Sequence, residues 1–184
     1  PSSVRDKNAP SPDLSGIKGI IPLLGVCYGA QYLVHNYGGE VLPSGIREYG
    51  RANLVSVNSK DPLFTNIKPG TQVWMSHADT IAKIPEGYEI TGSTADVKAA
   101  AYHIKGESTW GIQFHPEVYH TTEGTQILKN FVNGICGCAQ NWTPDSFVGS
   151  TVNNLKEKLG DNRVILGLSG GVDSSVAAFL LHKA

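Results

Sequence analysis

The sequence has 184 residues, of which 40% are hydrophobic and 17% are charged, and its 21 glycines and 10 prolines indicate many tight turns. This composition is typical of a globular protein and excludes a disordered or fibrous chain. Fifteen Lys and Arg against 16 Asp and Glu give a formal net charge of −1, which excludes the basic surface expected of a protein that binds nucleic acid or an anionic membrane.

The remaining bulk features predict a soluble protein. The apolar stretch from Gly19 to Val34 is interrupted by Pro22 and by glycines, and it is too short for a membrane span of about 20 residues. The chain begins at Pro1 and its one methionine is Met75, which predicts truncation at both ends and no signal sequence. Three cysteines without paired spacing argue against disulfides and favour the cytoplasm.

The first part of the chain predicts an α/β domain. Residues 1–16 are rich in Ser, Pro, Asn and Asp, which indicates a surface loop. The continuously apolar run at 20–26 predicts a central strand covered on both faces. A helix is expected over residues 30–37, ended by two glycines.

Short segments rich in β-branched and aromatic residues follow. They predict strands at 52–57, 72–75, 88–91, 99–103 and 111–114. Apolar residues at helical spacing then predict a helix over 125–134.

A second series of predicted helices and strands begins after Trp142. Thr143-Pro144-Asp145 predicts the N-cap and first turn of a helix that runs to Gly160. Residues 163–168 predict a buried strand, 169–173 a Gly-rich turn and 174–182 a helix. Because residues 142–184 are too few to build a covered sheet, we expect one domain over 1–141 and the incomplete start of another over 142–184.

A cysteine follows the first predicted strand. Cys27 stands in Gly25-Val26-Cys27-Tyr28-Gly29, a G-x-C-x-G form of the nucleophile elbow, in which glycines allow a strand to turn sharply into a helix. The helix N-terminus is expected to lower the pKa of the thiol and to hold an oxyanion. The alternative is a small buried hydrophobic residue.

A histidine and a glutamate follow the strand predicted at 111–114. His115 and Glu117 stand at the carboxyl end of that strand, where open α/β sheets place their sites. Residues i and i+2 of an extended chain point the same way, so Glu117 can orient His115. A thiol nucleophile needs a base, which makes Cys27, His115 and Glu117 a candidate triad. Taken alone, His115 fits a turn histidine with a solvated Glu better, and the presence of Cys27 shifts this preference.

Other polar clusters are less specific. His77, within Met75-Ser76-His77-Ala78-Asp79, fits a hydrogen-bonded loop as well as a substrate contact. His115 and His120 lack the i, i+4 spacing of a helical zinc site, and Cys136 and Cys138 lack a second pair of ligands. We therefore assign no metal ligand.

A Gly-rich segment follows the strand predicted at 163–168. Ser169-Gly170-Gly171-Val172-Asp173-Ser174-Ser175 combines backbone N–H groups, three hydroxyls and a helix N-terminus, which favours phosphate binding. It is neither a P-loop, because no Lys follows the glycines, nor a dinucleotide-binding turn. The alternative is a plain turn in which Ser174 caps the helix.

Together these motifs resemble known families. Gly25 to Gln31 with His115-Pro116-Glu117 is similar to the class I, triad-type glutamine amidotransferases, and residues 169–175 resemble the PP-loop of the N-type ATP pyrophosphatases. Their order on one chain resembles the glutamine-hydrolysing GMP synthetase family. The resemblance implies an α/β, flavodoxin-like fold with a mostly parallel or mixed sheet flanked by helices, followed by the first strand, loop and helix of a second α/β domain.

The resemblance also implies a reaction. Cys27 would attack the side-chain amide of glutamine, His115 would pass the proton to the departing ammonia, and Glu117 would support His115. The residues expected to contact glutamine are Tyr28, Gln31, Ser76 and Asp79, and Ala78 stands where many relatives have Gly. ATP, with Mg²⁺, is expected at Ser169, Gly170, Gly171, Val172, Asp173, Ser174 and Ser175. Ammonia would convert adenylated XMP to GMP, with release of AMP and pyrophosphate.

Further expectations concern a longer parent protein, which the family implies is a homodimer. A second oxyanion donor would come from a Gly-rich loop that ends near Pro1. Loss of one donor slows catalysis by about 10²–10³, so we expect residues 1–184 alone to be weak or inactive. The XMP site would lie beyond Ala184. The alternatives are another class I amidotransferase, a γ-glutamyl hydrolase, or a non-catalytic nucleotide-binding module.

Overall fold

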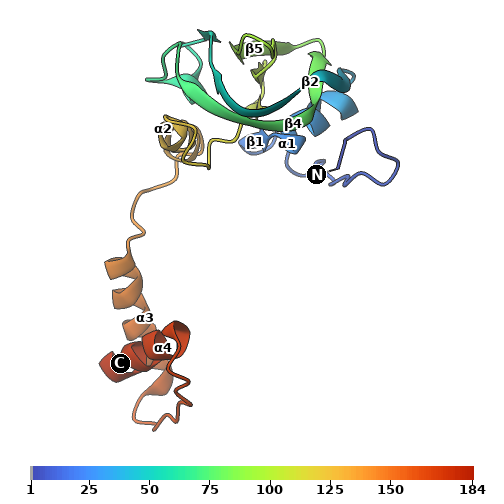
Figure 1. Cartoon of the computed structure of the whole chain (residues 1–184). Coiled ribbons are helices and arrows are strands. Elements are labelled where there is room, and N and C mark those ends of the chain that lie inside the picture. Colours follow the sequence, from blue (N-terminus) through green and yellow to red (C-terminus); the bar gives the residue numbers. More distant parts are fainter. Residues whose placement is uncertain (1) are drawn as a thin grey trace. The chain divides into compact units, whose positions relative to one another are not determined.

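The computed structural model describes residues 2–184, apart from the side chains of residues 45–48. The Gly-rich loop expected near Pro1 lies outside these residues. The chain forms two compact units, Pro1–Cys138 and Ala139–Ala184, drawn from blue to gold and from orange to red in Figure 1. The sequence placed this division between residues 141 and 142.

A five-stranded mixed sheet forms the centre of the first unit. Its strands, in spatial order, are β1 (Leu23–Val26), β7 (Thr109–Ile112), β6 (Ala101–Ile104), β5 (Tyr88–Ser93) and β3 (Ser56–Val57). The predicted mixed sheet is confirmed, but its described strands pair mostly antiparallel, and β1, which the sequence predicted as a central strand, lies at the end of the described sheet. Among the described strands, parallel pairing is limited to β1 and β7, because short connections such as the one from β6 to β7 permit antiparallel pairing alone.

The first unit also contains a second, two-stranded sheet. β2 (Glu40–Asn53) and β4 (Gln72–Lys83) pair antiparallel, and Figure 1 shows them as a long curved ribbon. The sequence predicted just the final residues of β2 and the first residues of β4. Pro43 and the charged side chains of β2 hide its strand character, because strand propensity reflects packing more than residue type.

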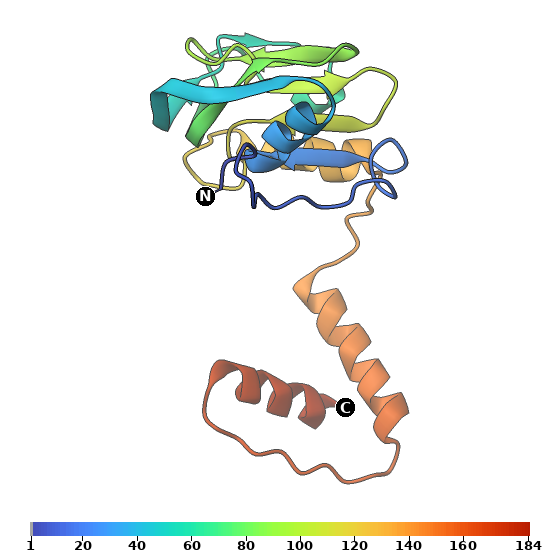
Figure 2. The same cartoon turned by 90° about the vertical axis from the view of Figure 1, so that its right-hand side faces the viewer.

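Helices cover both faces of the main sheet. α1 (Tyr28–Asn36) supplies Leu33 to a core cluster that also contains Tyr102, and α2 (Gly124–Lys129) supplies Ile127 to a cluster that contains Ala101. Successive strand residues point to opposite faces, so α1 and α2 pack on opposite sides of β6. Figure 2 shows α1 beside β1, both in blue.

Two helical segments depart from the expected pattern. α2 continues into a π-helical segment, η2 (Asn130–Ile135), where the sequence predicted one helix, and the 3₁₀ turn η1 (Pro62–Phe64) packs against η2. Thus the expected helical segment is present, with a change of hydrogen-bond pattern after Lys129.

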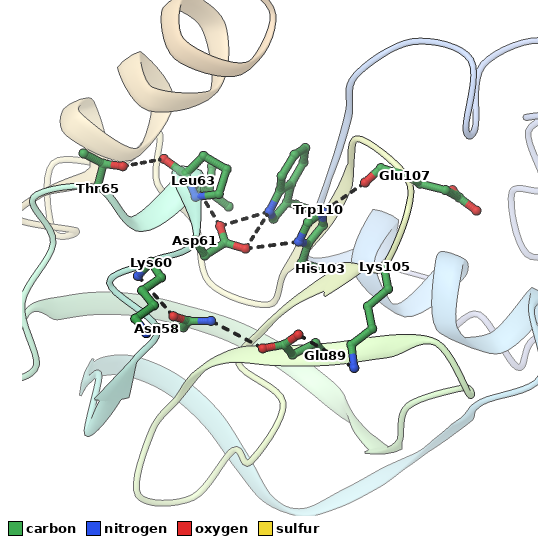
Figure 3. A network of polar contacts seen from close by, with 11 residues as sticks. Asn58, Lys60, Asp61, Leu63, Thr65, Glu89, His103, Lys105, Glu107 and Trp110 are labelled. Atoms are coloured by element: carbon green, nitrogen blue, oxygen red, sulfur yellow. Dashed lines mark hydrogen bonds and ion pairs between the residues drawn. The ribbon is translucent and has the colours of Figure 1, made fainter.

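A buried carboxylate ties η1 to the sheet. Asp61, 5% exposed, accepts hydrogen bonds from the Trp110 indole at 3.0 and 3.1 Å and from the Leu63 N–H at 2.9 Å, and it lies 3.3 Å from Nδ1 of His103 (Figure 3). The His103 ring stacks on Trp110. These contacts fix the start of β7, the strand that leads to His115.

The second unit contains α3 (Pro144–Leu159) and α4 (Val172–Lys183). Thr143 caps α3 by accepting the Ser146 N–H at 3.0 Å, as expected. The strand predicted at 163–168 is not formed, and Ile165 is 98% exposed. A strand needs a hydrogen-bonded neighbour, and the described part of this unit supplies none. In the described chain, no helix is long and apolar enough to cross a membrane.

Candidate active site

Cys27 lies on a sharp turn between β1 and α1. Its φ is +50°, a conformation that a non-glycine residue adopts at a cost and that is enriched at functional sites. The N–H of Cys27 donates to the Ile112 carbonyl at 2.8 Å, and its carbonyl accepts the Gln31 N–H at 3.1 Å. The geometry is that of the predicted elbow.

Gly25 permits this turn sterically. A Cβ at position 25 would lie 2.8 Å from the carbonyl carbon of Gly29, whereas a Cβ at position 29 would meet nothing within 4 Å. The first glycine of the motif is therefore required by close backbone approach, and the second is not.

Parallel pairing brings the other candidate residues to the same edge. Val26 pairs with Ile112, so Cys27 and Gln113 directly follow neighbouring strand ends, and His115 lies two residues further on. The predicted imidazole–carboxylate pair forms, with Nδ1 of His115 2.6 Å from Oε1 of Glu117. The His115 N–H also donates to the Trp74 carbonyl at 2.9 Å.

The sulfur of Cys27 has two polar neighbours. It lies 3.8 Å from the Ser76 carbonyl oxygen and 3.7 Å from Nε2 of Gln113. A direct hydrogen bond between this sulfur and His115 is not among the contacts of the described residues. The structure thus brings His115 and Glu117 together and places Cys27 at the same sheet edge.

A pocket of about 90 Å³ opens at Cys27. All four residues expected to contact glutamine share it with the cysteine. Its lining consists of Ser2, Ser3, Cys27, Tyr28, Gln31, Ser76, His77, Ala78 and Asp79. His115 and Glu117 do not belong to this lining. His77, which the sequence left undecided, does.

Asp79 provides a buried negative charge in this pocket. Its side chain is 8% exposed, Arg5 Nη2 lies 3.0 Å from Oδ1, and the Ser3 hydroxyl donates to Oδ2. Its backbone carbonyl accepts Nε2 of Gln31 at 2.8 Å and lies 2.9 Å from Nδ1 of His77. Asp79 is therefore arranged to face a cation.

The electrostatics of the thiol differ from the expectation. Burial raises the pKa of Cys27, and the charge of Glu117 raises it further, whereas the Tyr28 N–H and the Gln113 amide act in the opposite direction. The Tyr28 N–H at the helix terminus does act to lower the thiol pKa, but the expected net lowering is wrong, because desolvation is the larger effect. Burial also lowers the pKa of His77, which favours its neutral form.

Gln113 and Thr121 are among the site residues that were not predicted. Gln113 is fully buried and contacts the sulfur. Thr121 accepts the Trp74 N–H at 3.0 Å and donates to the His115 carbonyl at 2.5 Å. A polar amide in the apolar segment Gly111–Phe114 was the available signal for Gln113, whereas Thr121 carried none.

The Gly-rich segment of the second unit is exposed. Gly170 has a φ of +82°, Gly171 is the N-cap of α4, and the hydroxyls of Ser169 and Ser174 lie 3.0 Å apart. Ser174 does not cap the helix, because its hydroxyl donates to the Gly171 carbonyl. Within the described residues, no group of three His, Cys, Asp or Glu side chains is placed to hold a metal ion.

Comparison with known proteins finds a family-model match in each unit. The family model for glutamine amidotransferase class-I matches residues 1–135, and that for NAD synthase matches residues 146–184. Proteins named GMP synthase (glutamine-hydrolyzing) from Cytophaga hutchinsonii and Christiangramia forsetii are each 60% identical over all 184 residues, and one from Bacteroides fragilis is 56% identical. The chain spans 36% of the length of these relatives.

Solved structures agree at the level of the fold. A Thermoplasma acidophilum protein described as one subunit of a GMP synthase has a TM-score of 0.60 and 32% identity, over 63% of this chain and 57% of that one. PurLQS from Thermotoga maritima has a TM-score of 0.52 and 16% identity, over 63% and 62%. The match over residues 1–135 and the elbow at Cys27 show that the chain belongs to the class-I glutamine amidotransferase family.

Proposed function

We propose that the chain is the glutamine-hydrolysing part, with the start of the ATP-dependent part, of a GMP synthase. One observation carries this proposal: Cys27 shares its pocket with Gln31, Ser76 and Asp79, at the sheet edge that also bears the His115–Glu117 pair. Relatives with this name that are 56–60% identical over the whole chain support it.

Glutamine would bind with its ammonium group toward Asp79. That carboxylate is buried and already faces the guanidinium of Arg5, so a substrate ammonium group would replace or join an existing cation. The pocket would then hold the side-chain amide at Cys27, where the backbone N–H of Tyr28 would donate to the developing oxyanion.

The reaction would proceed through a thioester. The Cys27 thiol transfers its proton to His115, and the sulfur attacks the amide carbon of glutamine. His115 then protonates the leaving nitrogen, the carbon–nitrogen bond breaks, and ammonia departs. Water attacks the thioester carbon as His115 accepts its proton, the carbon–sulfur bond breaks, and His115 returns the proton to the leaving sulfur, which gives glutamate and the free thiol.

The raised pKa of Cys27 fits this sequence of proton transfers. A thiol that burial keeps neutral needs a base at the moment of attack. Glu117 lies 2.6 Å from the His115 ring and would stabilise the imidazolium formed. The positive charge that arises there would also offset the unfavourable effect of Glu117 on the thiolate.

The second unit would bind ATP. Exposed hydroxyls and backbone N–H groups of residues 169–175 are chemically suited to phosphate. Mg²⁺ would arrive with the nucleotide, since Asp173 is the one carboxylate in that segment. We assign the adenylation of XMP, its amination to GMP, the XMP site and the contacts of a homodimer to the longer protein. The three free thiols favour a cytoplasmic location.

Separate substitutions test the two activities in the full-length protein. Cys27→Ala should abolish GMP formation from glutamine and leave formation from added ammonium, because ammonium bypasses the thioester. Cys136→Ala, a matched change outside the pocket, should preserve both activities. Asp173→Ala should lower synthesis from either nitrogen source while Cys27 stays reactive.

Steady-state assays with each nitrogen source measure these effects. Loss of both activities in Cys27→Ala, with the fold intact by circular dichroism, would contradict the proposed division of labour. Glutamine hydrolysis without any XMP-dependent ATP consumption would instead favour another class I amidotransferase or a γ-glutamyl hydrolase.

A further inference from the structure

We propose that Gln113 is a catalytic residue of the glutaminase site, which donates a side-chain hydrogen bond to the sulfur of Cys27 and stabilises the nucleophile as its proton leaves. Its part in turnover rests on the proposed function. The contact itself does not.

The backbone holds Gln113 rigidly beside the elbow. Gln113 follows Ile112, whose carbonyl accepts the Cys27 N–H, and its own N–H donates to the Ala100 carbonyl at 2.8 Å. The side chain is completely buried, with Nε2 3.7 Å from the sulfur. Buried side-chain amides in proteins are nearly always hydrogen-bonded, and the sulfur of Cys27 is a partner within reach of this one.

Gln31 fixes which end of the Gln113 amide faces the sulfur. Nε2 of Gln31 donates to the Asp79 carbonyl at 2.8 Å and to Oε1 of Gln113 at 3.1 Å. Because the Asp79 carbonyl can only accept, the nitrogen of Gln31 must point this way. Gln113 then presents its oxygen to Gln31 and its NH₂ group to Cys27.

This donor distinguishes the two protonation states of the sulfur. The neutral thiol can donate to the Ser76 carbonyl at 3.8 Å, a contact that turns repulsive once the sulfur is charged. The Gln113 N–H favours the charged form, because hydrogen bonds to ions are stronger than those to neutral groups. The Gln113 amide accordingly acts to lower the pKa of Cys27.

Other titratable or charged groups also face this sulfur or its pocket. Glu117 raises the pKa of Cys27, and its partner His115 follows β7. His77 and Asp79 reach the pocket from β4, and Arg5 pairs with Asp79. The test must therefore observe the sulfur directly rather than infer its state from activity.

Thiolate absorbance near 240 nm provides that observation in the full-length protein, taken as the difference from Cys27→Ser. Gln113→Met keeps the side-chain volume and removes the donor. We expect the Cys27 thiolate fraction at pH values below the pKa to fall about tenfold, with a matching fall in kcat for glutamine. Gln126→Met, a matched change on α2, should leave the titration unchanged.

A titration of Gln113→Met that coincides with the unsubstituted protein would overturn the assignment. If that variant fails to fold, the side-chain NH₂ resonances of Gln113 in the unsubstituted protein decide. They should shift as Cys27 ionises, and resonances that stay constant would contradict the contact. Absence of glutamine hydrolysis in the unsubstituted protein would refute the proposed function. The titration of Cys27 would still show whether Gln113 donates a hydrogen bond to its sulfur.

Discussion

The residues around Cys27 combine local strain with an unfavourable environment for charge. The sequence predicted the elbow and the His115–Glu117 pair, because both follow from short-range spacing. It predicted a lowered pKa for Cys27, whereas the pKa is raised, because Ser76 of β4 and Gln113, which follows β7, lie against a largely buried sulfur. Burial arises from contacts between distant segments, so no local motif carries it.

Thr121 closes a ring of hydrogen bonds that holds the His115 backbone. The His115 N–H donates to the Trp74 carbonyl, the Trp74 N–H donates to the Thr121 hydroxyl, and that hydroxyl donates to the His115 carbonyl. Thr121→Val keeps the side-chain shape and leaves the Trp74 N–H and the His115 carbonyl without the Thr121 hydroxyl as a partner. We expect destabilisation by about 1–3 kcal/mol and about tenfold lower glutaminase activity.

Thermal unfolding and glutamine kinetics of the full-length protein measure these effects. Thr121→Ser, which retains the hydroxyl and loses the methyl group, should restore most of the activity. Equal activity of the Val and Ser variants would show that the hydroxyl does not position His115.

Two strand predictions failed because the available pairing partner, and not residue type, determined whether each strand formed. β2 was mostly missed, and the strand expected at 163–168 is absent from the described structure. In the first case a long partner, β4, stabilises a segment with poor strand propensity. In the second, the described residues of that unit offer no strand with which this apolar segment could pair. Strand formation therefore followed the available neighbour rather than residue type.

Gly25 and Gly29, on either side of the turn between β1 and α1, are expected to respond differently to substitution by alanine. Gly25→Ala forces a Cβ to within 2.8 Å of the Gly29 backbone, and we expect destabilisation by about 1–3 kcal/mol with loss of glutaminase activity. Gly29→Ala meets open space and should stabilise α1 by up to about 1 kcal/mol.

Denaturant unfolding of the two variants checks this distinction. Equal stability of the Gly25→Ala and Gly29→Ala proteins would mean that the elbow does not depend on the close approach of Gly25 to α1.

For the whole molecule, the order of two motifs on one chain carried more information than either motif alone. The amidotransferase family match covers residues 1–135, and a separate match covers residues 146–184. These ranges fall on either side of the division between the two compact units. The family resemblance implied the mixed sheet, because spacing along the chain does not determine strand order, and the pairing of β1 with β7 was not predicted.

Covalent labelling of the three free cysteines in the full-length protein, by a chloroketone analogue of glutamine, decides whether Cys27 is the nucleophile. Cys138 is exposed and Cys27 is not, so accessibility alone would favour Cys138. We predict that peptide mapping finds the label on Cys27 at neutral pH, that glutamine protects it, and that Cys136 and Cys138 react far more slowly. Equal labelling of all three cysteines, unaffected by glutamine, would contradict a catalytic Cys27.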